Sequence, residues 1–306
     1  MVILTGCGST GGEKEIILFH AGSLSAPVKE IVQNYEALHP GVSVITQAAG
    51  SRASARKITD LNRPCDVFAS ADYSVIDNLL IPDYASWNIP FATNEMVIAY
   101  RDESRFADSI SRENWPEILS SPEVIYGRSN PDHDPCGYRT VITIRLAGKC
   151  LRSPEWAESL LQKDKNFIRP KETDLIALLE TGSVDYFFIY RSVAQQHHLN
   201  WLILPDSINL KNPNLTDFYS QATVEVSGKK PGETIIKRGE PMIYGITVPT
   251  TAPHPELAID FVRYWLSSEG GAKILEEMGQ PSVIPSPTET FSRVPRELKS
   301  FVLPAN

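Results

Sequence analysis

Two short segments share one pattern, in which an apolar run is followed by a glycine, a serine and then a helical periodicity. The first contains Gly22 and Ser23, and the second contains Gly50 and Ser51. Unpaired backbone N–H groups at a helix start attract anions, and glycine allows a ligand to approach them closely. Two such segments together predict an anion site, although each serine alone is also explained as an ordinary N-cap.

The segment 129–137, Ser-Asn-Pro-Asp-His-Asp-Pro-Cys-Gly, has the most unusual composition in the chain. Asp134 directly precedes Pro135, which predicts an N-cap carboxylate followed by the first residue of a helix. Asp132, His133 and Asp134 could instead be read as metal ligands. Adjacent residues rarely converge on one ion, so the helix start is the favoured interpretation.

The cysteines show no C-x-x-C spacing, which gives a zinc site or a redox pair little support; they are Cys7, Cys65, Cys136 and Cys150. Cys136 at a predicted helix start would have a lowered pKa, so a hydrolase that uses it with His133 or His20 is an alternative. No G-x-S-x-G motif accompanies it, and packing explains this cysteine equally well.

Further polar groups stand where predicted elements begin or end. Glu172 and Asp174 open a helix that ends before Gly182, and acidic residues in a first turn ordinarily interact with the helix dipole. Tyr190 ends an apolar strand, so its hydroxyl could reach a cleft. Alternatively, Tyr190 could be a core side chain whose hydroxyl is solvated.

The elements that must hold these residues alternate between strand and helix. This order predicts an α/β fold in which parallel sheets are covered on both faces. We expect strands at 16–19, 42–45, 66–69, 95–100, 124–126 and 185–190, and helices at 24–38, 51–61, 75–80, 135–146 and 173–181. The last third adds strands at 222–227, 233–237 and 241–249, then helices around 257–265 and 274–278, the latter with Gly279 as C-cap.

The composition is that of a globular protein. The 306 residues predict about two domains, and 42% hydrophobic and 22% charged residues are close to globular averages. The net charge of −8 disfavours a nucleic-acid partner or an anionic membrane surface. An anion would therefore have to be held by local geometry.

The first residues resemble the end of an export signal. Leu4-Thr-Gly-Cys7 is similar to a lipobox, whose cysteine becomes acylated, and Gly8-Ser-Thr-Gly-Gly12 has the composition of a flexible spacer. We predict that residues 1–13 are a signal remnant and tether, with an incidental cysteine in an unstructured N-terminus as the alternative.

Taken together, these segments resemble the archaeal-type molybdate/tungstate-binding proteins of ABC importers, a branch of the periplasmic-binding-protein superfamily. The resemblance extends over nearly the whole chain from about residue 14, and its single motifs are less specific than their order and spacing. The matching text is Phe19-His-Ala-Gly-Ser-Leu24, Ala49-Gly-Ser51, Asp66-Val-Phe-Ala-Ser-Ala-Asp-Tyr73, Asn130-Pro, Asp134-Pro-Cys-Gly-Tyr-Arg139, Asp185-Tyr-Phe-Phe-Ile-Tyr-Arg-Ser-Val-Ala194 and Tyr244-Gly-Ile-Thr247.

The resemblance implies a type II fold of two α/β lobes with a hinge and an interlobe cleft. Lobe 1 would comprise residues 14–93 and 242–306, and lobe 2 residues 94–241. Two crossovers near 92–95 and 240–244 would join them.

The resemblance also implies the ligand contacts. Hydroxyls of Ser23, Ser51 and Tyr190 and backbone N–H groups near Cys136 and Gly137 would bind the oxyanion. The carboxylates of Asp134 and Glu172 would coordinate its metal, with Asp174 as the alternative to Glu172.

The function implied is that of a monomeric, extracellular solute-binding protein, lipid-anchored at Cys7, which delivers tungstate or molybdate to an ABC permease with its ATPase. No enzymatic activity and no cofactor are expected. The same fold with sulfate, phosphate or ferric ion is the main alternative. A ferric site would need the tyrosines at 186–190 with His197 and His198, which we expect at the surface.

Overall fold

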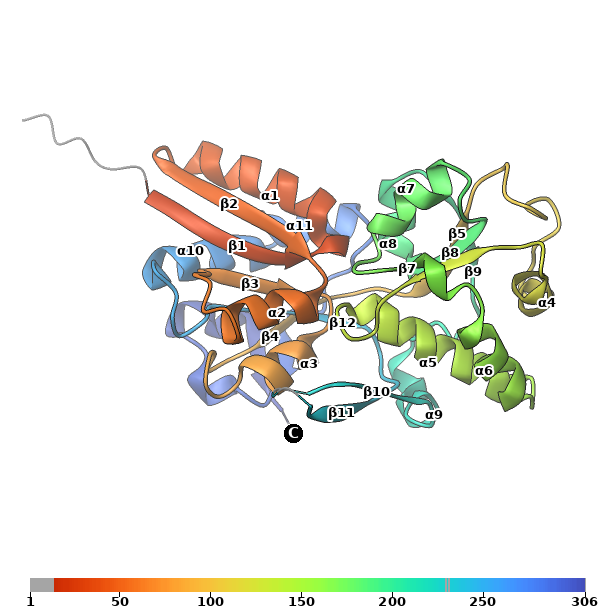
Figure 1. Ribbon diagram of the computed structural model, residues 1–306. Coiled ribbons are helices and arrows are strands. Elements are labelled where there is room, and N and C mark those ends of the chain that lie inside the picture. The colour runs from red at the N-terminus through yellow and green to blue at the C-terminus, as the bar shows by residue number, and fades with distance from the viewer. Residues whose placement is uncertain (1–13, 229, 231, 306) are drawn as a thin grey trace, which may run out of the picture.

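The computed structural model describes residues 14–228, 230 and 232–305. The chain forms two α/β lobes side by side, and the segments at its two ends share one of them (Figure 1). Each lobe is built on a five-stranded sheet. The predicted two-lobe α/β class is confirmed.

The sheet of the first lobe has the strand order β2-β1-β3-β12-β4. Its strands are β1 (Lys14–Ala21), β2 (Val42–Ala49), β3 (Val67–Ser70), β4 (Ile89–Thr93) and β12 (Ile243–Thr247). Strand β1 is parallel to β2 and β3, whereas β12 is antiparallel to both of its neighbours. The carboxyl ends of the three parallel strands therefore meet at one edge, where ligand sites of such sheets form.

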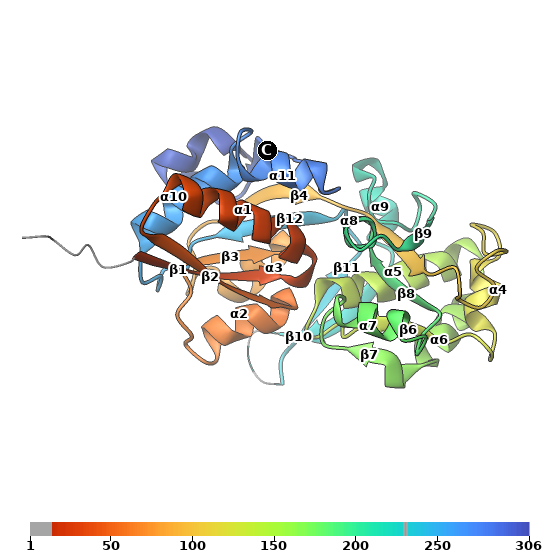
Figure 2. The same ribbon diagram turned by 90° about the horizontal axis from the view of Figure 1, so that it is seen from above.

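Helices cover both faces of this sheet (Figure 2). On one face lie α1 (Ser25–Leu38), α10 (Pro255–Leu266) and α11 (Gly271–Glu277), which contact one another. On the other lie α2 (Ser51–Thr59), α3 (Tyr73–Val75) and a π-helix at Ile76–Leu80. Helix α1 buries Val28, Ile31 and Tyr35, a spacing that places them on one side.

The sheet of the second lobe has the order β7-β6-β8-β5-β9. Its strands are β5 (Met96–Tyr100), β6 (Tyr126–Ser129), β7 (Ile168–Arg169), β8 (Tyr186–Tyr190) and β9 (Asn200–Ile203). Its helices are α4 (Trp115–Ser120), α5 (Pro135–Cys150), α6 (Pro154–Gln162), α7 (Asp174–Glu180), α8 (Arg191–Gln196) and α9 (Thr216–Tyr219). The parallel strands β6 and β8 end beside the starts of α5 and α8, which directs the polar residues there toward the first lobe.

The chain passes between the lobes twice. The first passage, from β4 to β5, runs through Asn94 and Glu95, and the second leads from the hairpin of β10 (Thr223–Ser227) and β11 (Thr234–Arg238) to β12. The hairpin spans the underside of the lobe junction in Figure 1, where Gly228 accepts a hydrogen bond of 2.8 Å from Arg56 of α2. The residue bounds predicted for the two lobes stay a prediction.

Several element predictions need correction. The strand expected at 124–126 lies at Tyr126–Ser129, because the backbone N–H of Ile125 is bound by the Asp185 carboxylate at 2.9 Å and does not extend the ladder. The helix expected at 75–80 is a short α-helix that continues as a π-helix. Short elements were not predicted at all: β4, β7, β9, α4, α6, α8, α9 and the pair β13 (Ser286–Thr288) and β14 (Val302–Pro304).

Candidate functional site

The two predicted serines lie buried where strands of the first lobe end. Ser51 is the first residue of α2, and its Oγ accepts a hydrogen bond of 3.0 Å from the backbone N–H of Ala71. Ser23 lies in the 3₁₀ turn Gly22–Leu24 after β1, and its Oγ accepts one of 3.3 Å from the Tyr244 hydroxyl. Since each hydroxyl accepts, its own proton is available for donation to a ligand.

The two predicted acids lie side by side in the second lobe. Asp134 is the N-cap of α5, as predicted, and one of its oxygens accepts from the backbone N–H of Cys136 at 3.3 Å. Its other oxygen accepts from the backbone N–H of Glu172 at 2.9 Å. Each residue is only 1% exposed. Among the described residues, no N–H or O–H group donates a hydrogen bond to the Glu172 carboxyl oxygens.

Burial changes the protonation of this pair. It raises the pKa of both carboxyl groups, and the charge of Asp134 raises the pKa of Glu172 further. Two adjacent buried carboxylates cannot both ionise easily. The pair therefore keeps a proton at a pH where ordinary carboxylates have lost theirs.

Glycines let the two lobes meet at these residues. A Cβ on Gly22 would lie 3.2 and 3.3 Å from the Glu172 carboxyl oxygens, and a Cβ on Gly50 would lie 2.4 Å from the carbonyl oxygen of His133. The same carbonyl accepts a hydrogen bond of 3.1 Å from the backbone N–H of Ala53. The structure is thus a closed form, in which residues of both lobes surround the predicted site.

Tyr190 ends β8 and is fully buried. Its hydroxyl accepts a hydrogen bond of 3.1 Å from Arg139, and its ring packs edge-on against Tyr244 of the first lobe. Burial raises the pKa of Tyr190 well above its usual value. The residue is therefore a neutral phenol that can donate a hydrogen bond.

The predicted backbone donors at the start of α5 are already engaged. The N–H of Cys136 binds the Asp134 side chain, and the N–H of Gly137 binds the Asp134 carbonyl at 3.0 Å. A Cβ on Gly137 would lie 2.5 Å from the backbone of Asn130, so this glycine allows close packing of the loop.

Asp174, the alternative to Glu172, lies elsewhere. Its carboxylate is 3.6 Å from the Lys171 ammonium, and a third of its side chain is exposed. The structure therefore brings Glu172, and not Asp174, next to Asp134.

The lowered pKa predicted for Cys136 is wrong. Burial, together with the nearby carboxyl groups, raises the pKa of its thiol well above the usual value and outweighs the helix terminus. His20 is buried, which lowers its pKa to about 4, and His133 is exposed. Nothing in this arrangement activates a nucleophile.

The structure does not support a metal-ion site built from His, Cys, Asp or Glu side chains in the described residues. Within 14–228, 230 and 232–305 there is no group of three or more His, Cys, Asp or Glu side chains that could hold an ion. His197 and His198 are exposed, as predicted.

The sequence analysis missed a buried cluster behind the site. Asp72 of the first lobe lies 3.1 Å from the Lys237 ammonium and 4.0 Å from the Arg139 guanidinium, and it accepts a hydrogen bond from Tyr138. Burial opposes ionisation, but Lys237 and Arg139 hold the pKa of Asp72 below its usual range. Tyr138 and Arg139 lie in the helix 135–146 that the apolar pattern predicted, but no local pattern indicated a partner 66 residues away.

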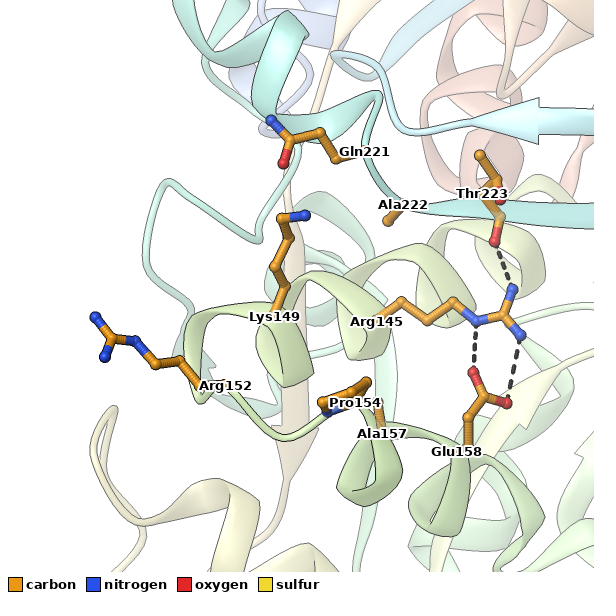
Figure 3. A pocket seen from close by; sticks show the side chains of 9 residues that line it. All are labelled: Arg145, Lys149, Arg152, Pro154, Ala157, Glu158, Gln221, Ala222 and Thr223. Atoms are coloured by element: carbon orange, nitrogen blue, oxygen red, sulfur yellow. Dashed lines mark hydrogen bonds and ion pairs between the residues drawn. The ribbon is translucent and has the colours of Figure 1, made fainter.

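A separate surface pocket of about 490 Å³ lies on the second lobe between α5, α6 and β10 (Figure 3). Its basic residues are Arg145, Lys149 and Arg152. Arg145 is paired with Glu158 at 2.8 Å, and Arg152 extends away from Arg145 in Figure 3. None of the predicted ligand contacts lines this pocket.

The fold and the site define a class: a two-lobed binding protein whose polar groups from both lobes converge on one buried site. Comparison with protein families specifies it. Residues 16–279 match the family of bacterial extracellular solute-binding proteins, and the chain belongs to this family.

Two relatives agree with this assignment, and a solved structure shares the fold. An uncharacterised solute-binding protein of Petrotoga mobilis is 49% identical over 94% of this chain and 90% of its own length. The molybdate/tungstate-binding protein WtpA of Thermococcus kodakarensis is 41% identical over 95% of this chain and 88% of its own length. The periplasmic molybdate-binding protein of Azotobacter vinelandii shares the fold, with a TM-score of 0.64, 13% identity and coverage of 87% and 98% of the two chains.

The family places this protein outside the cytoplasmic membrane. Among the described residues, the helices are too short or too polar to cross a bilayer. Cys7 and the predicted tether lie outside the described residues.

Proposed function

We propose that this protein captures tungstate or molybdate between its lobes and delivers the oxyanion to an ABC permease with its ATPase. The observation that carries the proposal is that the hydroxyls of Ser23, Ser51 and Tyr190 and the carboxyl pair of Asp134 and Glu172 lie buried where the two lobes meet. The similarity of this protein to a relative named for molybdate and tungstate binding supports the same ligands.

The hydroxyls provide the donors that a buried dianion needs. An oxyanion without water is costly to bury unless its oxygens receive several oriented hydrogen bonds. Ser23, Ser51 and Tyr190 each accept a hydrogen bond from the protein and keep a proton to donate. A protein with a net charge of −8 can in this way bind an anion through local geometry.

The carboxyl pair provides selectivity. Carboxylates next to a sulfate or phosphate are repulsive, whereas tungsten and molybdenum have empty d orbitals that accept carboxylate oxygens. Asp134 and Glu172 would therefore expand the metal to six-coordination and reject the smaller anions. Coordination through both groups requires that the pair release its proton.

Closure completes the site. The first lobe contributes Ser23 and Ser51, and the second contributes Tyr190 and the carboxyl pair, so a ligand that contacts both lobes stabilises the closed state. The closed form is what the permease would recognise. The ligand leaves unchanged, because the chain binds it and catalyses no reaction on it.

We further propose that the protein is a monomer held at the outer face of the membrane by a lipid on Cys7. The lipobox-like text at 4–7 and the spacer at 8–12 support this location. A cell-surface tether would keep the protein near its permease.

Isothermal calorimetry with tungstate, molybdate, sulfate and phosphate on one preparation tests the proposal. We expect nanomolar dissociation constants for tungstate and molybdate and no measurable heat for the other two. Tight sulfate or phosphate binding would favour the alternative of the same fold with another ligand.

A further inference from the structure

A hydrogen-bonded path connects the ligand hydroxyls of the two lobes. We propose that Arg139 is a positioning residue that orients the Tyr190 hydroxyl as a donor to the bound oxyanion when the lobes close. This inference rests on the proposed function and assigns a role to a residue that does not itself contact the ligand.

The path runs through four residues. Arg139 Nη1 donates to the Tyr190 hydroxyl at 3.1 Å and to the Ala71 carbonyl at 2.6 Å. The N–H of Ala71 donates to Ser51 Oγ at 3.0 Å. The Ala71 N–H thus binds the Ser51 hydroxyl, the Arg139 guanidinium binds the Tyr190 hydroxyl, and the Ala71 carbonyl links the two.

The direction of each hydrogen bond decides what the hydroxyls can do. Arginine only donates hydrogen bonds, so the Tyr190 oxygen must accept from Arg139. The hydroxyl proton of Tyr190 must therefore point away from the guanidinium. Burial keeps Tyr190 in the neutral form that carries this proton. In the same way, the Ser51 oxygen accepts from the Ala71 N–H, and its proton must point elsewhere. Each hydroxyl thus accepts one hydrogen bond from the protein and keeps its proton free to donate to an oxyanion.

The charge of Arg139 is balanced before any ligand arrives. Asp72 lies 4.0 Å from its guanidinium and also pairs with Lys237 at 3.1 Å. Lys237 also lies 3.7 Å from Glu240, so Arg139, which is 2% exposed, belongs to a cluster of two cations and two carboxyl groups. The arginine can therefore act on Tyr190 at short range without attracting all anions indiscriminately.

The path exists only in the closed form. Ala71 and Asp72 follow β3 in the first lobe, whereas Arg139 lies on α5 and Tyr190 ends β8 in the second lobe. Separation of the lobes removes both first-lobe acceptors from Arg139. The orientation of Tyr190 is therefore coupled to closure.

A double-mutant cycle on tungstate affinity tests this role. We expect Tyr190→Phe and Arg139→Met each to weaken binding by about 10- to 100-fold, which is the range for a hydrogen bond to a charged group. The double variant should bind no more weakly than the weaker single variant, because both remove the same hydrogen bond. Lys237→Met is the matched control, because it also removes a cation from Asp72 although Lys237 does not contact Tyr190. The loss of tungstate affinity that it causes should therefore multiply with the loss that Tyr190→Phe causes.

Arg139→Lys covers the case in which Arg139→Met does not fold. It keeps a positive charge, but a single ammonium cannot both donate to Ala71 and Tyr190, as Nη1 does, and face Asp72, as Nη2 does. We expect wild-type thermal stability with affinity as low as in Tyr190→Phe, and again no further loss in the double variant. Independent, multiplying losses of Arg139 and Tyr190 variants would overturn the inference, while a wild-type protein that binds no tungstate would overturn the proposed function itself.

Discussion

The backbone N–H of Glu172 donates a hydrogen bond of 2.9 Å to the Asp134 carboxylate, which fixes two buried carboxyl groups next to each other. The N-cap position of Asp134 leaves it one oxygen for this contact, because the other binds the N–H of Cys136. The carboxyl group of Glu172 itself lies next to Gly22 of the opposite lobe. Four predictions follow from this geometry and from its surroundings.

The first prediction concerns pH and the ligand-free protein. Because burial raises the pKa of both carboxyl groups, the folded state binds more protons than the unfolded chain. Stability from this pair is therefore complete below the ordinary pKa of about 4 and is lost as pH rises through the raised values, at about 1.4 kcal/mol per pH unit and proton. Melting temperatures between pH 5 and 8 should fall less steeply in Asp134→Asn with Glu172→Gln than in the wild type.

The difference between the wild type and this double variant isolates the pH dependence of stability that comes from the carboxyl pair. His20, with its pKa lowered to about 4, has the opposite sign, since its contribution is lost as pH falls below about 6.5. Asp72, with its pKa held low, loses its contribution only below about pH 4. Equal slopes for wild type and double variant would show that the pair does not hold a proton.

The second prediction concerns selectivity. Asp134→Ala combined with Glu172→Ala should narrow the ratio of tungstate to sulfate affinity, because it removes both the metal coordination and the repulsion of sulfate. Ser23→Ala is the control and should weaken all oxyanions alike, by about tenfold or more for one lost hydrogen bond to a charged ligand. Calorimetry with both anions measures the ratios, and an unchanged ratio in the double variant would contradict the coordination model.

The third prediction concerns closure. Gly50 has a φ of −57°, which alanine tolerates, but a Cβ there would lie 2.4 Å from the His133 carbonyl of the other lobe. Gly50→Ala should therefore leave each lobe folded and weaken tungstate binding by about 100-fold or more, the order expected for a clash of several kcal/mol. Gly22→Ala should cost less, since its Cβ would meet side-chain oxygens of Glu172 at 3.2 and 3.3 Å.

Small-angle scattering with and without tungstate measures this effect. The wild type should contract on addition of ligand, and Gly50→Ala should keep the radius of gyration of the open form. If Gly50→Ala contracted like the wild type and bound with full affinity, the lobes would not meet at this residue.

The fourth prediction concerns the thiols. Burial raises the pKa of both Cys65 and Cys136, whereas Cys150 is exposed. Treatment with iodoacetamide at pH 8 should modify Cys150 and leave the other two unmodified, as measured by peptide mass. Rapid alkylation of Cys136 would revive the hydrolase alternative.

Much of the fold could be predicted because its signals are local. The apolar run after residue 14 and the helical spacing of Val28, Ile31 and Tyr35 indicate β1 and α1 directly. Gly279 adopts a φ of +85°, in agreement with its predicted place at the end of a helix. Short edge strands such as Ile168–Arg169 carry too few residues to show any periodicity.

The positions of three candidate site residues in the fold were predictable because each follows a strand or opens a helix: Ser23, Ser51 and Asp134. The partners that orient these residues were not. Asp72 and Arg139 come together only when two lobes dock, and neither residue type nor local spacing indicates that contact. The pKa of Cys136 was mispredicted for the same reason, since burial depends on the whole fold.

The most direct test of the central claim is a crystal structure of the protein grown with tungstate, with the metal located by its anomalous signal. We predict tungsten between the lobes, with Ser23, Ser51 and Tyr190 donating to its oxygens and one carboxylate oxygen each from Asp134 and Glu172 completing six-coordination. An ion located elsewhere, or one held by cations such as Lys149 and Arg152 of the surface pocket, would contradict it.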